Sequence, residues 1–89
     1  MYGFDYGKAL KEIEHSGLKF TPYPQTKLIN VEDKYGIIQS YYASTGTAVF
    51  RDSNHKYNAQ RRTVRLMMCD EFIELCLDGD KIFDKYFSE

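Results

Sequence analysis

Short segments rich in β-branched and aromatic residues, separated by turn signals, fill the middle of the chain. The strongest, residues 36–43, holds two isoleucines and two tyrosines, which favour strands. Ser44-Thr45-Gly46 follows and indicates a hairpin connection to the next segment. Connections this short join antiparallel strands, because parallel strands need a long crossover. We expect three to four strands in one antiparallel meander, drawn from the segments 18–21, 27–32, 36–43, 47–51 and 62–68.

Helices are expected on both sides of these strands. Residues 4–16 have apolar side chains at helical spacing, with Asp5 placed to cap the helix and Gly17 placed to end it. A second helix is expected after Asp70, its predicted N-cap, and Asp78-Gly79-Asp80 separates it from a further short helix. The fold class that follows is α+β: an N-terminal helix, an antiparallel β-meander and one or two C-terminal helices covering the sheet.

A chain of 89 residues predicts a single compact domain, 1–89. Its hydrophobic fraction of 43 % is too high for a disordered chain. The longest apolar run is Leu66–Cys69, whereas a membrane span needs about 20 apolar residues, so we expect no membrane partner. The first residues lack the features of a secretory signal. We therefore expect a cytoplasmic protein.

The cysteines support the same expectation about the compartment. Cys69 and Cys76 are seven positions apart on one predicted helix. Two helical turns separate such positions by roughly 10 Å, and a disulfide requires Cα atoms within roughly 7 Å. We expect both cysteines to be reduced and buried, as in cytosolic proteins.

Charge is unevenly distributed along the chain, although its total is only −1 at pH 7. Residues 51–65 carry a net charge of +4, mostly from arginines, which bind carboxylates and phosphates through paired hydrogen bonds. Residues 69–89 carry a net charge of −5. We predict that the acidic residues bind a partner and that the basic ones bind nucleic acid or an acidic partner. The acidic candidates are Asp70, Glu71, Glu74, Asp78, Asp80 and Asp84, and the basic candidates are Arg51, Lys56, Arg61, Arg62 and Arg65.

The common patterns of catalytic and metal sites are missing from the sequence. His15 and His55 are the only histidines, and the cysteines form no Cys-x-x-Cys pair. Ser44–Thr47 does not match the G-x-x-x-x-G-K-[ST] pattern of a phosphate-binding loop. A buried helical thiol has little reason to ionise and act as a nucleophile. We expect a protein that is not an enzyme and that binds no metal and no cofactor.

Aromatic residues on neighbouring strands raise the question of nucleic-acid stacking. Tyr41, Tyr42 and Phe50, with Arg51 nearby, have the composition of a stacking platform. Tyr41 and Tyr42 point to opposite faces of a strand, so the pattern buries at most one of them.

Residues 36–54 read GIIQSYYASTGTAVFRDSN, and Asp70-Glu71-Phe72-Ile73 follows further along. These stretches resemble small accessory proteins of bacteriophages and prophages. The resemblance implies a bacterial cytoplasmic protein that blocks a host machine stoichiometrically, as anti-CRISPR proteins do when they occupy the nucleic-acid groove of a Cas nuclease.

Three functions remain open at this level. The first is a non-enzymatic binding protein, such as a phage-encoded inhibitor of a bacterial defence enzyme, that occupies a protein partner's surface. The second is a small nucleic-acid-binding module that uses the basic segment 51–65. The third is a structural or homo-oligomeric subunit whose exposed aromatic residues pack against copies of itself.

Overall fold

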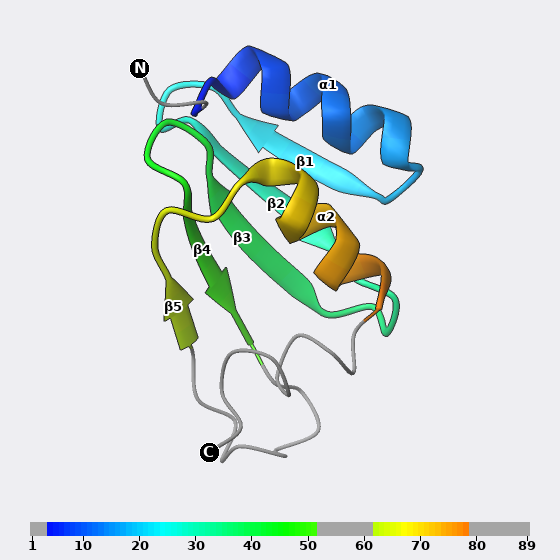
Figure 1. Ribbon diagram of the computed structural model, residues 1–89. Helices are drawn as coiled ribbons and strands as arrows, with labels where there is room; N and C mark the ends of the chain where they lie inside the picture. Colours follow the sequence, from blue (N-terminus) through cyan, green and yellow to red (C-terminus); the bar gives the residue numbers. More distant parts are fainter. Residues whose placement is uncertain (1–3, 52–61, 79–89) are drawn as a thin grey trace.

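A five-stranded antiparallel meander with two helices makes up the computed structural model, which describes residues 4–51 and 62–78 (Figure 1). The strands pair in chain order, β1-β2-β3-β4-β5, so each strand lies beside its sequence neighbour. The arrangement confirms the predicted α+β class, with five strands where three to four were expected. The elements are α1 (Tyr6–Ser16), β1 (Phe20–Tyr23), β2 (Leu28–Glu32), β3 (Ile38–Tyr42), β4 (Thr47–Phe50), β5 (Arg62–Val64) and α2 (Cys69–Leu77).

Strand β1 continues through Pro22, where the sequence pattern predicted a break. The backbone N–H of Glu32 donates to the carbonyl oxygen of Lys19 at 2.9 Å, which fixes the residues of β1 that face β2. Successive residues of a strand point their backbone N–H and C=O groups to alternate sides. The backbone groups of Lys19, Thr21 and Tyr23 therefore point toward β2, and the backbone nitrogen of Pro22 points outward at the edge of the sheet. A proline is tolerated there because no ladder hydrogen bond needs its missing N–H.

Helix α1 begins and ends where the sequence predicts. The Asp5 carboxylate accepts hydrogen bonds from the backbone N–H groups of Gly7 and Lys8, at 2.9 and 3.3 Å. Gly17 closes the helix in the left-handed conformation, with a φ of 85°. Neither α1 nor α2, the helices of the described residues, has the length and apolarity to cross a bilayer.

Helix α2 starts two residues earlier than predicted, and Asp70 is not its N-cap. The N-cap is Met68, whose side chain makes no capping hydrogen bond, and the Asp70 carboxylate accepts from the N–H of Glu71 at 2.8 Å. The sheet fixes this start, because Met67 donates to Gly46 O at 2.8 Å and accepts from the Tyr41 hydroxyl at 2.6 Å. The predicted second C-terminal helix lies outside the described residues.

Both helices pack on one face of the sheet, and the core lies between the helices and the sheet (Figure 1). The rings of Tyr41 and Phe72 stack with centroids 4.9 Å apart, and Phe50 lies 5.7 Å from Phe72. The predicted alternation is confirmed, since Tyr41 is buried while Tyr42 is 37 % exposed on the opposite face. The core residues are Ala9, Ile13, Ile29, Val31, Tyr41, Ala43, Ala48, Phe50, Met67, Cys69, Phe72, Leu75 and Cys76.

Candidate functional site

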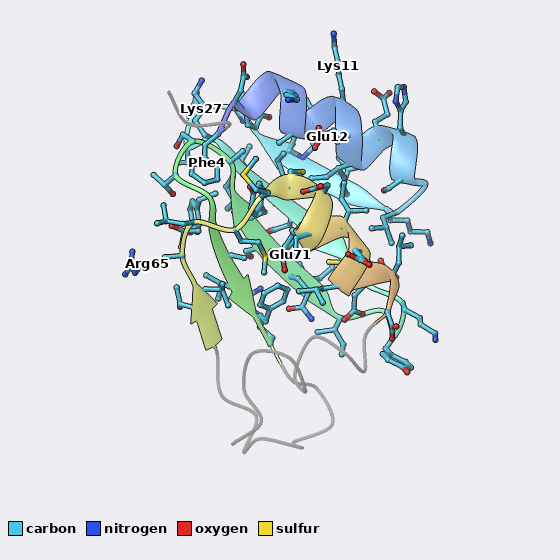
Figure 2. All side chains as sticks on the ribbon, in the orientation of Figure 1. Phe4, Lys11, Glu12, Lys27, Arg65 and Glu71 are labelled. Atoms are coloured by element: carbon cyan, nitrogen blue, oxygen red, sulfur yellow. The ribbon has the colours of Figure 1, made fainter. Side chains whose placement is uncertain are left out.

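Helix α2 presents an acidic surface on the side that faces away from the sheet. Its inner side is buried, and its outer side carries Asp70, Glu71, Glu74 and Asp78, which we call the acidic α2 surface. Asp70 and Glu74 are exposed, and Glu71, which is labelled in Figure 2, and Asp78 are partly buried. The sequence places no basic residue between positions 69 and 78. The other two acidic candidates, Asp80 and Asp84, lie outside the described residues.

The spacing of these acids works against the stability of the helix. Asp70 and Glu74 are four residues apart, as are Glu74 and Asp78. Like charges at this spacing destabilise a helix by roughly 0.2–0.5 kcal/mol per pair. Negative charge near the C-terminal end is also unfavourable to the helix dipole, and the last turn of α2 contains no basic residue. Asp70 and Glu71 lie in the first turn of α2, where negative charge favours the helix dipole. Helix stability therefore explains these two acids but not Glu74, whose charge lies four residues from two other acids.

Arg51 belongs to a polar network that spans the sheet. Its backbone N–H donates to Gln39 Oε1 at 2.7 Å, and its carbonyl oxygen accepts from Gln39 Nε2 at 3.2 Å. The same Nε2 donates to the buried carboxylate of Asp33 at 3.0 Å. The Arg51 guanidinium donates to Ile38 O at 2.8 Å and to Ser40 Oγ at 3.0 Å. Arg51 therefore has a structural role in holding β3 and the end of β4 together.

The described basic candidates do not form one surface with the acids of α2. The Arg51 guanidinium contacts Ser40, whose side chain lies on the face of the sheet opposite α2. Arg65 is exposed just beyond β5 and points away from the rest of the molecule (Figure 2). Arg62 belongs to β5, and Lys56 and Arg61 lie outside the described residues. Arg51 and the acids of α2, which are separate in the sequence, therefore also lie on opposite faces of the sheet.

The proposed stacking platform is not present as predicted. Tyr41 and Phe50 are buried against Phe72, so neither presents a ring to a ligand. Tyr42 is exposed, and it shares its face with Tyr23 and Ile38, which are 44 % and 43 % exposed. The sequence pattern did not predict this grouping. Strand alternation places these three side chains on one face, but it does not say which face the helices cover.

A crevice of about 140 Å³ separates the start of α1 from the start of α2. Cys69 lies in it, and burial, followed by the nearby Glu12 carboxylate, raises the pKa of its thiol to about 12. Burial also raises the pKa of the Cys76 thiol. Both cysteines are free, as predicted, and neither thiol ionises near neutral pH. In residues 4–51 and 62–78 no three His, Cys, Asp or Glu side chains gather in a metal-binding group.

Comparison of the chain with models of protein families, with curated proteins and with solved structures finds no match. The chemistry of the surfaces themselves is therefore the basis for a functional proposal.

Proposed function

We propose that this protein is a non-enzymatic binding protein that occupies a basic surface of a protein partner through its acidic α2 surface. One observation carries the proposal: a helix fixed to the core by Phe72, Leu75 and Cys76 presents only acids among its charged residues. Their spacing costs helix stability, which a purely structural surface would avoid by mixing charges.

A basic partner gives this arrangement a physical reason. Cations facing Asp70 and Glu74 would replace repulsion along the helix by attraction across an interface. Such complementarity raises the rate of association and selects the partner. The helix needs no rearrangement to bind, because its start is fixed by the hydrogen bonds of Met67 to Gly46 and Tyr41. A preformed surface of this kind loses little conformational entropy on binding.

The class of partner that we propose is a nuclease of a bacterial defence system. Nucleic-acid grooves are lined with lysine and arginine to neutralise phosphates, so an acidic helix is complementary to them. The resemblance of residues 36–54 to phage accessory proteins supports the same choice. Two unpaired cysteines support action in the cytoplasm, where thiols stay reduced.

The test is affinity capture from a bacterial lysate with and without nuclease treatment, with the captured proteins identified by mass spectrometry. The bait is the wild-type chain or a variant that combines Asp70→Asn with Glu74→Gln. Asn at position 70 keeps the oxygen that accepts from the N–H of Glu71, so the fold is preserved. We expect one protein to be captured by the wild-type chain, and we expect the neutralised variant to lose it. High salt should weaken the complex.

Glu14→Lys is the matched control, because it changes the net charge by the same two units at an exposed position on α1. It should retain the partner. Equal loss with both variants would show that net charge, and not the acidic α2 surface, controls binding. Recovery that disappears on nuclease treatment would instead favour the nucleic-acid-binding module.

A further inference from the structure

The face of the sheet opposite the helices, which we call the open face, carries a cluster of exposed apolar side chains. Tyr23, Ile38 and Tyr42 are each between 37 % and 44 % exposed. Tyr23 pairs with Leu28, which in turn pairs with Tyr42, so the two tyrosines lie two strands apart. That separation is about 10 Å at the usual spacing of strands. Exposed apolar residues that share one face of a sheet make that face a candidate interaction surface.

The Ser40 hydroxyl, between Ile38 and Tyr42 on the open face, is paired on both sides. Ser40 Oγ donates to Asn30 Oδ1 at 2.8 Å and accepts from the Arg51 guanidinium at 3.0 Å. The Ser40 hydroxyl can therefore be covered by a partner without losing a hydrogen bond.

The charges of the open face are complementary to those of a second copy of the same face. Glu32 pairs with Ile38 from the β2 side, while the Arg51 guanidinium bonds to the carbonyl oxygen of Ile38 from the β4 side. Ile38 thus has an acid on one flank and a base on the other. A two-fold axis lying along β3 would place β2 of one copy over β4 of the other. Each Glu32 would then face an Arg51, and each Ile38 would face its counterpart.

We propose that a second copy of this chain covers the open face, forming a symmetric dimer of two sheets packed face to face. Apolar contact at Ile38 and Tyr42, which lie on β3 at the axis, drives the association, and opposite charges at its flanks set the orientation. Aligned sheets pack about 10 Å apart, the geometry of a β-sandwich core. The two helical layers then lie on the outside, so the dimer presents two acidic α2 surfaces facing opposite directions.

The experiment is sedimentation equilibrium on the purified full chain over a wide range of concentration. The apparent mass should rise from the chain mass of 10.5 kDa toward twice that value. Ile38→Lys and Tyr42→Lys each place a cation opposite its own symmetry mate, and each should weaken the dimer by about tenfold or more. Leu77→Lys is the matched control, since Leu77 is 50 % exposed but belongs to α2 on the other side of the sheet. It should leave the dimer unchanged.

Cross-linking tests the same contact without relying on the stability of a lysine variant. Ile38→Cys with a short bismaleimide should give a covalent dimer, because the two positions face each other, and the native cysteines are buried. Gln25→Cys, in the turn after β1, should not cross-link. A monomer mass at every concentration would overturn the proposal. So would a dimer that survives both lysine variants in folded form, since another surface would then mediate it.

Discussion

The aromatic ring of Phe4 lies directly against the backbone of Gly46. This contact joins the residue before the α1 cap to the turn between β3 and β4 (Figure 2). A methyl group added at Gly46 would come within 2.6 Å of Phe4 Cζ, and the φ of Gly46 is +74°. The position therefore requires glycine for two reasons, the backbone conformation and the space.

Gly46→Ala should destabilise the fold by about 2–4 kcal/mol. The left-handed conformation accounts for roughly 1–2 kcal/mol and the steric conflict for the rest. Gly17→Ala separates the two terms, because Gly17 has a φ of +85° but nothing within 4 Å of an added methyl group. Urea unfolding should show the smaller loss for Gly17→Ala. Adding Phe4→Ala to Gly46→Ala should remove the steric part alone, and equal losses at both glycines would contradict the role of Phe4.

Gln39→Met should cost about 2–4 kcal/mol, although methionine preserves the volume of the side chain. Gln39 is fully buried, and its amide bonds to the Asp33 carboxylate and to both backbone groups of Arg51. Each buried group left unpaired costs roughly 1–3 kcal/mol. Gln25→Met, at an exposed position, should change the unfolding free energy by less than about 0.5 kcal/mol. A Gln39→Met protein as stable as wild type would show that water replaces the network.

Leu66→Asn should keep or raise stability, by up to about 1 kcal/mol. Leu66 has a φ of 59° and is 73 % exposed, so the wild-type chain bears backbone strain for little burial. Asparagine tolerates this conformation better than leucine. Lys27→Asn is the comparison, because Lys27 has a φ of 60° but its ammonium lies 5.5 Å from the centre of the Tyr6 ring. Thermal unfolding should show a smaller gain for Lys27→Asn, and a clear loss at Leu66 would indicate a contact made by its side chain.

Stability should fall as pH rises above about 9. Burial, and then the Glu12 carboxylate, raise the pKa of the Cys69 thiol from 9.0 to about 12. Between those values the unfolded chain releases the thiol proton and the folded chain keeps it, so ionisation favours unfolding. Below pH 9 both states hold the proton, and this group adds no pH dependence. Urea titrations from neutral to alkaline pH measure how steeply the free energy of unfolding falls with pH. Cys69→Ala should make this fall less steep.

The same burial predicts slow thiol chemistry in the native state. A disulfide reagent such as dithionitrobenzoate should react with both cysteines in denaturant and with neither in the folded protein at neutral pH, because both are buried. Rapid reaction of Cys69 in the native protein would mean that the crevice between α1 and α2 opens easily.

Local signals in the sequence predicted the features that depend on neighbouring residues. Asp5 caps α1 and Gly17 ends it, because capping involves contacts within one helical turn. The opposite fates of Tyr41 and Tyr42 follow from strand alternation alone. The acids of α2 could likewise be placed on its outer side, since the apolar spacing predicts which side is buried.

Tertiary structure decided the rest, because the responsible contacts join residues far apart in the chain. Asp70 has the chemistry of an N-cap, but bonds from Met67 to Gly46 and Tyr41 determine where α2 begins. Pro22 breaks strands in general, yet it lies within β1 because β1 is an edge strand. Strand alternation divides side chains between two faces without saying which face is covered. The packing of both helices on one side made Phe50 a core residue and left Tyr23, Ile38 and Tyr42 exposed on the other.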